Sequence, residues 1–282
     1  MALGGLYLKA ALSSVGPRAR ELPDTVLTRE RLEVDRAHLA EYNRVCGFGL
    51  TDALPVTYPH LLGFGLQVEL MASRSFPLPL PGLVHINNTI AVHRRIEVGE
   101  KLDVRVHAER FVSHPKGAQV DLVAGIRAGD QEVWTGRSTY LARGAKAPDG
   151  GVTDAPDRPE SGSAPVDLDA PPTAVWKVDS GLGRRYASVS GDVNPIHLHP
   201  LTAKAFGFPR AIAHGMWTAA HALAAVEGRL PDGLTYDVSF GPPVLLPSTV
   251  ELRTRDRDGT WYLDVRSRNR PHLTGSVTPL VG

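Results

Sequence analysis

The sequence predicts an α+β protein made of two similar units, each a buried helix followed by antiparallel strands. In the first unit, segment 55–73 carries Leu62, Leu66 and Leu70 at four-residue spacing, which is typical of a helix with an apolar face. In the second unit, the apolar, alanine-rich run 217–226 indicates a second buried helix. Alternating strand-like segments follow each helix, so the same order of elements occurs twice. These segments are 102–106, 120–122 and 133–140 in the first unit, and 236–240, 250–252 and 261–265 in the second.

A change of composition separates the two units. Segment 144–173 repeats Ala-Pro and is rich in Gly, Ser and Asp, with few large apolar residues and no clear period. Such a stretch buries too little surface to order itself, which predicts a flexible linker. The predicted domains are therefore 1–143 and 174–282, each long enough to bury a core of its own.

Composition places the chain among globular proteins and limits the classes of partner that it can bind. Hydrophobic residues make up 42% and charged residues 22% of the 282 residues, and the net charge is +1. This charge predicts no general attraction to nucleic acid or to an anionic membrane. No apolar run approaches the roughly eighteen residues that a membrane helix needs. A single cysteine, Cys46, excludes an internal disulfide framework, and we expect a cytoplasmic protein.

The segment 186–197 holds the residues that indicate chemistry. Asp192 and His197 stand five positions apart, and Gly191 and Pro195 interrupt the stretch, so it cannot be one regular helix. A stiffened turn of this kind can direct a carboxylate and an imidazole at one small volume. Acid–base chemistry on one water or substrate proton needs such an arrangement.

A second short segment supplies a candidate oxyanion donor. His214-Gly215-Met216 precedes the predicted helix 217–226. The start of a helix presents free backbone N–H groups and a partial positive charge, which suit an oxygen that becomes negative during a reaction. We expect His214 to be mainly structural and Gly215 to contribute its N–H.

These residues carry a family resemblance. Ser190-Gly-Asp-Val-Asn-Pro-Ile-His197, Ala205-Phe-Gly-Phe208 and Ile212-Ala-His-Gly-Met216 resemble the motif of the MaoC-like dehydratases, which include the R-specific enoyl-CoA hydratases. The resemblance implies a hotdog fold, a curved antiparallel sheet around a central helix, and two units imply a double hotdog. It also implies that Asp192 and His197 are catalytic. Gly215 is then the backbone donor to the thioester oxygen.

The resemblance implies a (3R)-hydroxyacyl thioester dehydratase, which in reverse is a trans-2-enoyl-CoA hydratase. It needs no metal or other cofactor, because coenzyme A or phosphopantetheine is part of the substrate. Three alternatives stay open: a carrier-protein-specific dehydratase of fatty acid or polyketide synthesis, a hotdog acyl thioesterase, and a non-catalytic acyl-binding protein. The Asp-x-Asn-Pro-x-His spacing fits water addition to an alkene better than thioester hydrolysis, and a binding protein would need no acid–base pair.

Further residues near the motif have candidate roles. Asn194 is a candidate for substrate binding, although holding the loop is its more ordinary role. The pair His197 and His199, with Asp192 and His214 nearby, has the residue types of a metal site, but no metal is expected because no cysteine is near and the resembling family works without one. The basic side chains around the motif could bind the phosphates of coenzyme A or phosphopantetheine, although each alone is more typical of a solvated surface. They are Arg184, Arg185, Lys204 and Arg210.

The first unit has no counterpart of the Asp–His motif. Its segment 34–57 contains Asp35, His38 and Asp52, but not their spacing. Double-hotdog members of the family have one catalytic half and one half that has lost the motif and often widens the acyl channel. We therefore expect one active site per chain, with the first half lining the acyl pocket. The resemblance also allows a homodimer of double hotdogs.

Overall fold

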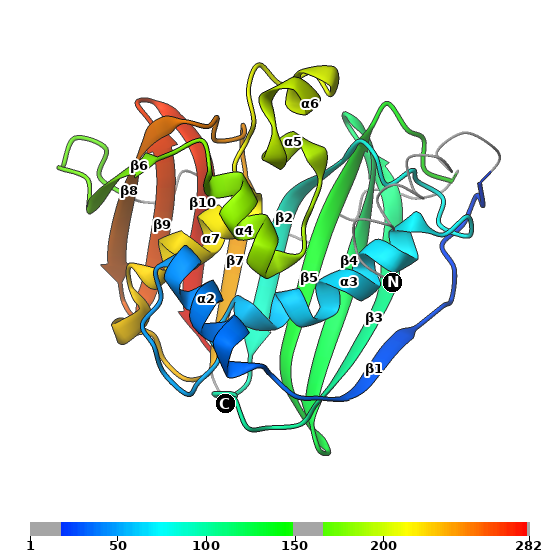
Figure 1. The fold of residues 1–282 in the computed structure, drawn as a ribbon, viewed down its shortest axis with the longest axis horizontal. Helices are drawn as coiled ribbons and strands as arrows, with labels where there is room; N and C mark the ends of the chain where they lie inside the picture. Colours follow the sequence, from blue (N-terminus) through cyan, green and yellow to red (C-terminus); the bar gives the residue numbers. More distant parts are fainter. Residues whose placement is uncertain (1–17, 149–165, 281–282) are drawn as a thin grey trace.

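The computed structural model describes residues 18–148 and 166–280, and in this part of the chain all strands join one ten-stranded antiparallel sheet (Figure 1). The strand order is β1-β3-β4-β5-β2-β7-β10-β9-β8-β6. The first half contributes β1 (Leu27–Leu32), β2 (Leu83–Val92), β3 (Leu102–His114), β4 (Gly117–Ala128) and β5 (Gln131–Arg143). The second half contributes β6 (Ala174–Val178), β7 (Leu234–Phe240), β8 (Ser248–Arg257), β9 (Thr260–Ser267) and β10 (Arg270–Pro279).

The two halves repeat one arrangement, which confirms the double hotdog. Outward from the junction of β2 with β7, the order β2-β5-β4-β3-β1 is matched by β7-β10-β9-β8-β6. Helix α3 (Tyr58–Ala72) lies over the strands of the first half and α7 (Gly215–Ala224) over those of the second (Figure 1). The remaining helices are α2 (Arg36–Cys46), α4 (Leu182–Ser190), α5 (Pro195–Leu198), α6 (Pro200–Ala205) and the 3₁₀ turn η1 (Glu227–Arg229). Of these, α4 and α5 lie near the junction of β2 and β7 (Figure 1).

The predicted linker 144–173 falls between β5 and β6. Strand β5 ends at Arg143 and β6 begins at Ala174, while residues 149–165 lie outside the described part of the chain. The domain boundaries therefore stay a prediction. Among the described residues, no helix is both long and apolar enough to cross a membrane.

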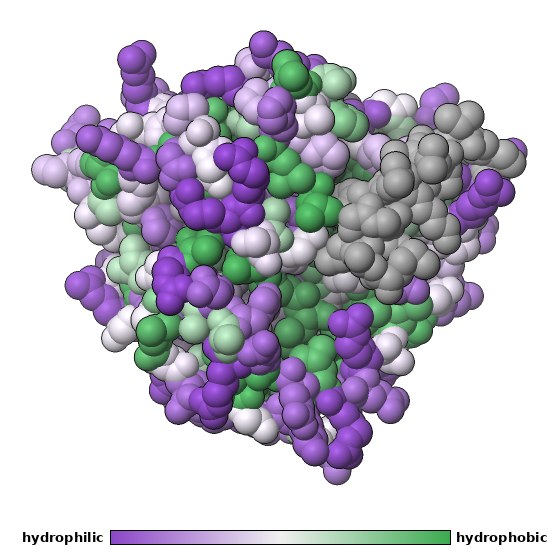
Figure 2. Space-filling model, in the orientation of Figure 1, coloured by the Kyte–Doolittle hydropathy of each residue, from purple (hydrophilic) through white to green (hydrophobic). Residues whose placement is uncertain are grey.

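Helix α3 is the central helix of the first half. It begins with Pro59 in its first turn, where a missing N–H costs nothing, and it is buried on most sides. A Cβ at Gly63 would lie 3.0 Å from the Ala124 side chain, so the glycine lets the helix approach the sheet closely. In the view of Figure 2, hydrophobic surface gathers along the middle of this face, with hydrophilic side chains around it.

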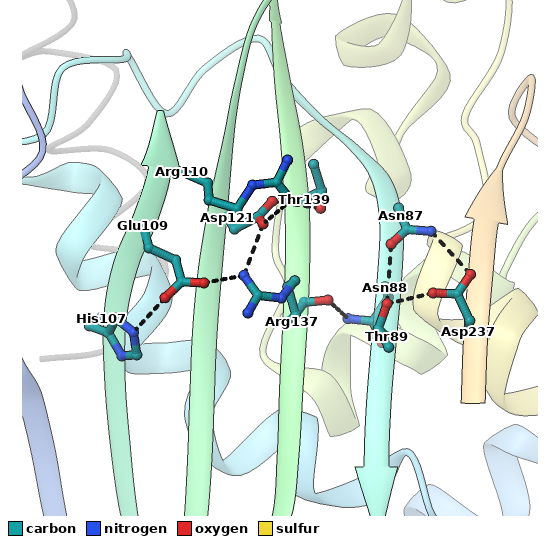
Figure 3. A network of polar contacts seen from close by, with 10 residues as sticks. All are labelled: Asn87, Asn88, Thr89, His107, Glu109, Arg110, Asp121, Arg137, Thr139 and Asp237. Atoms are coloured by element: carbon teal, nitrogen blue, oxygen red, sulfur yellow. Dashed lines mark hydrogen bonds and ion pairs between the residues drawn. The ribbon is translucent and has the colours of Figure 1, made fainter. Parts of the chain in front are cut away.

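The junction of the halves is a ladder between β2 and β7 that continues as a polar network. The ladder runs from Asn87 opposite Ser239 to Val92 opposite Leu234. Thr89 donates a hydrogen bond to Asp237 across it (2.5 Å), and Asn87 reaches the same carboxylate (3.5 Å) (Figure 3). Because these side chains are paired across the two halves, the junction is specified by hydrogen bonds as well as by the backbone.

The same network extends over the first half on the sheet face that points away from α3. Asp121 is fully buried, and it is held by Arg137 at 3.0 Å, Arg110 at 3.3 Å and Thr139 at 2.7 Å (Figure 3). Arg137 also pairs with Glu109. A buried carboxylate with several donors has its charge compensated. Removing one partner would leave part of that buried charge unpaired and would destabilise the fold.

Helices of one half also contact helices of the other. His38 of α2 bonds the Val189 carbonyl of α4 through Nε2 (2.8 Å). Trp217 of α7 donates to the Val45 carbonyl (3.0 Å), and His221 donates from Nδ1 to the Cys46 carbonyl (2.7 Å). The second half, which holds Asp192 and His197, thus takes part of its helical support from the first half.

We expect the isolated segment 174–282 to be poorly soluble or inactive. Without the first half, β7 loses its neighbour β2 and becomes an exposed edge, and α7 loses its contacts with α2. The measurement is soluble yield and hydratase activity of the segment alone and after co-expression with residues 1–143, which should restore both. A fully active isolated segment would show that the halves are independent.

Candidate active site

The segment that holds Asp192 and His197 is two short helices joined by a turn, as its glycine and proline predicted. Helix α4 ends at Ser190, and Gly191 adopts the left-handed conformation (φ 72°) that an L side chain rarely takes. Asn194 caps α5, because its side-chain oxygen accepts from the Ile196 N–H. The segment lies near the junction of β2 and β7 (Figure 1).

His197 is held as a neutral base. It is buried, and its Nδ1 lies 2.8 Å from the Ile212 carbonyl oxygen. A carbonyl only accepts, so Nδ1 carries the proton and Nε2 keeps a free lone pair. Burial lowers the pKa of His197 below its usual 6.5, while the Asp192 carboxylate and the Ile212 bond oppose this shift. A neutral imidazole with a bare Nε2 can take a proton from water.

His214 positions both members of the pair. Its Nε2 donates to the Asp192 backbone carbonyl (3.0 Å), and its ring stacks on that of His197 with centroids 3.7 Å apart. Burial and the neighbouring His197 lower the pKa of His214 to about 3, so it is neutral. The Asp192 side chain is 22% exposed, and it accepts from the Asn194 N–H at 3.1 Å. The expected structural role of His214 is consistent with these contacts.

The structure brings Asp192, His197 and His214 together. One nitrogen or oxygen atom of each lies within 4.8 Å of those of the other two, which is close enough for a shared proton network or a metal ion. Both imidazoles donate one N–H to a backbone carbonyl and keep the other nitrogen bare, an arrangement that metal-bound histidines share, so the expectation of no metal stays a prediction. His199 does not join the group, since it accepts from the Leu201 N–H and caps α6.

Gly215 is the first residue of α7, so its N–H has no acceptor within the helix. A Cβ at this position would lie 3.1 Å from the Phe240 ring, tighter than ordinary contact. The glycine thus lets an aromatic wall approach the helix start. Gly215 follows His214 of the group directly in the chain, and its role as the oxyanion donor stays a prediction.

Three of the four candidate phosphate ligands have structural partners. Arg184 donates to the Leu198 carbonyl (3.2 Å) and Arg210 to the Pro247 carbonyl (3.1 Å). Arg185 forms a bidentate pair with Asp179, which lowers the pKa of that carboxyl to about 2. Lys204 lies exposed on α6. A phosphate role for any of them stays a prediction.

The polar residues of the first half have structural roles of their own. Asp35 caps α2, Asp52 pairs with Arg36, and His38 links Tyr58 to Val189. Cys46 is buried, which raises the pKa of its thiol to about 12 and leaves it a small apolar residue rather than a nucleophile.

Sequence reasoning missed one residue that positions the site. A Cβ at Gly183 would lie 1.9 Å from the His197 carbonyl oxygen, so only glycine lets α4 pack against the backbone of α5. Nothing local in the sequence indicates this contact, because the two residues stand fourteen positions apart.

Comparison with known proteins decides the family. A model of the MaoC-like domain matches residues 169–266, which include the Asp192–His197 segment and Gly215. The 3-hydroxyacyl-thioester dehydratase X of Mycobacterium tuberculosis is 39% identical over 277 residues, 97% of this chain and 96% of that protein. This chain belongs to the MaoC-like dehydratase family.

Solved structures of MaoC-like dehydratases share its fold. The crystal structure of HtdX from Mycobacterium tuberculosis has a TM-score of 0.79 at 38% identity, covering 91% of this chain and 100% of that one. A MaoC-like dehydratase from Phytophthora capsici has a TM-score of 0.71 at 19% identity and covers 94% and 98%, which shows likeness of fold alone. The predicted family, fold and enzyme class, a hydro-lyase, are thereby confirmed.

Proposed function

We propose that this MaoC-like enzyme is a (3R)-hydroxyacyl thioester dehydratase, and in reverse a trans-2-enoyl thioester hydratase, with one active site formed by Asp192, His197 and Gly215. The observation that carries the proposal is that His197, whose tautomer is fixed by the Ile212 carbonyl, lies in one group with the Asp192 carboxylate. The relative from Mycobacterium tuberculosis is named a 3-hydroxyacyl-thioester dehydratase, which supports the same reaction here.

In the hydration direction, Asp192 and His197 hold one water against the β-carbon of the enoyl thioester. One member of the pair takes a proton as the water oxygen bonds to the β-carbon, and the electrons of the double bond move toward the thioester oxygen. The Gly215 N–H stabilises that oxygen, an effect often worth about 3 kcal/mol. The pair then returns a proton to the α-carbon on the same face. We treat the two groups as one coupled acid–base unit.

The alternatives differ in what the site must do. A thioesterase would direct water at the carbonyl carbon, whereas the Asp–His pair and the Gly215 N–H suit addition to an alkene whose carbonyl is polarised. A binding protein would need no buried base. A carrier-protein-specific dehydratase would use the same chemistry, and the basic residues around the site do not distinguish it from one that uses coenzyme A.

The test is hydration of trans-2-enoyl-CoA thioesters of increasing length, followed by chiral analysis of the product, with matching carrier-protein thioesters in parallel. The expected product is the (3R)-hydroxyacyl thioester. Release of free thiol without hydration would favour the thioesterase, and no turnover of any thioester would favour the binding protein.

We expect activity to survive removal of metal ions. A carboxylate and a neutral imidazole can together take a proton from water and return one, so the reaction needs no metal-bound water. The measurement is hydratase rate after exhaustive dialysis against a chelator, with metal content determined in the same sample. Loss of activity that zinc restores would make Asp192, His197 and His214 a metal site.

The acid limb of the pH profile is expected below pH 6.5. Burial lowers the pKa of His197 from 6.5, so the residue stays neutral as the pH falls to that value, and base activity is lost only as the pH falls through the lower pKa. The measurement is kcat/KM for hydration against pH, which reports the free enzyme. An acid limb centred above pH 6.5 would contradict the neutral, buried His197.

A further inference from the structure

Unpaired polar atoms are concentrated in the first half, on α3 and β2. In residues 18–148 and 166–280, ten buried side-chain nitrogen or oxygen atoms have no hydrogen-bond partner. Five of them belong to His60 and Gln67 of α3 and to His85 and Asn88 of β2. Both amide atoms of Gln67 are unpaired although the residue is fully buried. Since buried polar atoms are normally paired, such a concentration points to a ligand.

A series of ring contacts connects this group with the proposed active site. The rings of His60 and His85 are 6.3 Å apart between centroids, and His85 is 4.9 Å from Phe240. Phe240 in turn lies against Gly215, the proposed oxyanion donor. The Asp192 carboxylate also raises the pKa of both histidines against the stronger effect of burial. The histidines therefore lie on the first-half side of the same site.

An irregularity in β2 directs its two polar side chains toward α3. His85 pairs with Tyr140 and Asn88 with Ser138, with the register shifting between His85 and Asn87. Tyr140 and Ser138 are two residues apart on β5 and so face the same side of the sheet. The register shift inserts one extra residue into β2, so His85 and Asn88, although three positions apart, lie on the same face of the sheet. The His85 ring stacks on that of Tyr140, with the ring centroids 4.7 Å apart.

On α3 the polar positions continue away from the site. Gln67 is seven residues after His60, which is about two helical turns and about 10 Å along the same helix face. In Figure 1, α3 starts near the junction of the halves and runs outward over the strands of the first half. An acyl chain that follows α3 would meet His60 and His85 first and Gln67 further along.

The chemistry of the group specifies a neutral ligand. Burial lowers the pKa of His60 to about 4 and that of His85 to about 3, so both imidazoles are uncharged at neutral pH. Gln67 and Asn88 are neutral amides. These groups pair well with a hydroxyl or carbonyl oxygen, whereas a carboxylate or phosphate would need a cation. A plain alkyl chain would cover all of these atoms without pairing any.

We propose that the preferred substrate carries a neutral oxygen function, a hydroxyl or a carbonyl, on its acyl chain beyond the reacting carbons, and that His60, His85 and Gln67 bind it. This inference rests on the proposed dehydratase function and names its substrate class. Since one hydrogen bond gained or lost in a buried site changes an equilibrium by about tenfold, the preference over an alkyl chain of equal size should be tenfold or more.

The test compares pairs of enoyl-CoA thioesters in which a hydroxyl replaces a terminal methyl, with chain length increased one carbon at a time. We expect the full-length enzyme to show at least a tenfold higher kcat/KM for the hydroxylated member at one or more lengths. The same pairs, as saturated acyl-CoAs, are titrated by calorimetry, so that the preference is also measured without turnover. Equal values within every pair would overturn the inference.

Two variants assign the preference to residues. Gln67→Met removes both amide atoms at similar volume, and His85→Phe keeps an aromatic ring between Tyr140 and Phe240. Each should reduce the preference about tenfold at the chain length that its side chain reaches. The matched control is Leu66→Met, a volume-conserving change at a buried apolar position of the same helix, which should leave the ratio unchanged.

The outcomes separate the inference from the proposed function. Hydration of every thioester without preference would overturn the inference and leave the dehydratase standing. Absence of hydration would contradict the dehydratase, while calorimetry would still decide the preference. If both variants weakened the binding of all thioesters equally, Gln67 and His85 would bind the phosphopantetheine amides that every substrate shares. That result would overturn the assignment to the acyl chain.

Discussion

Replacement of Asp192 by Asn is expected to lower turnover by roughly 10²–10⁴, the range typical of lost acid–base catalysis, with the fold retained. The amide oxygen can still accept from the Asn194 N–H, so the change removes the carboxylate and little else. His197→Ala should cost a similar factor, because it removes the bare Nε2. The measurements are kcat and kcat/KM for enoyl-CoA hydration together with thermal unfolding.

His199→Ala is the matched control for the pair. His199 lies two residues from His197 but caps α6, so its loss should cost about 1 kcal/mol of stability and leave turnover near wild type. A folded Asp192→Asn enzyme with near-wild-type hydration would contradict the mechanism. So would a loss at His199 equal to that at His197.

The second large effect is expected at Gly183. Alanine favours helix over glycine by about 1 kcal/mol, but here its Cβ would lie 1.9 Å from the His197 carbonyl oxygen. Backbone cannot move aside cheaply, so α4 and α5 must separate, at a cost of about 1–3 kcal/mol in the free energy of unfolding. A displacement of His197 by about 1 Å should lower activity by roughly 10²-fold.

Gly228→Ala provides the comparison for this change. Gly228 lies in the 3₁₀ turn η1, and a Cβ there would meet no atom within 4 Å. It should leave activity and unfolding temperature close to wild type. If Gly183→Ala behaved like Gly228→Ala in both measurements, the contact of α4 with α5 would not be what positions His197.

The elements that the sequence revealed are those with a clear pattern. The stripe of Leu62, Leu66 and Leu70 predicted segment 55–73, and the structure has α3 at Tyr58–Ala72. The run 217–226 marked α7, although that helix begins at Gly215. The predicted strand segments correspond to β3, β4, β5, β7, β8 and β9. Of the others, β1 and β6 lie at the two ends of the sheet, so β1 is mostly exposed and polar, and β6 is short and follows directly on the proline-rich segment. Strand β10 contains Pro271 and Gly275, which weaken the strand pattern of its sequence.

The same distinction holds for the candidate site: features set by local sequence could be predicted, and contacts between distant segments could not. The spacing of Asp192 and His197, with Gly191 before the pair and Pro195 between its members, was sufficient to predict that they lie together, because the constraint is local. The tautomer of His197 depends on Ile212, fifteen residues away, and the contact of Gly183 depends on how two helices pack. His60 and His85 come from another half of the chain, and only the shared sheet makes them neighbours of the site.

Joining two hotdog units through β2 and β7 also limits aggregation. Two separate five-stranded sheets would present four open edges, whereas the fused sheet has only β1 and β6 at its ends within the described residues. Both ends discourage the addition of a foreign strand. β1 exposes Arg29, Glu30 and Arg31 and is distorted where Arg31 takes a positive φ, and β6 is only five residues long. Duplication within one chain therefore protects the protein in dilute solution, where a dimer of single units would separate and expose its junction strands.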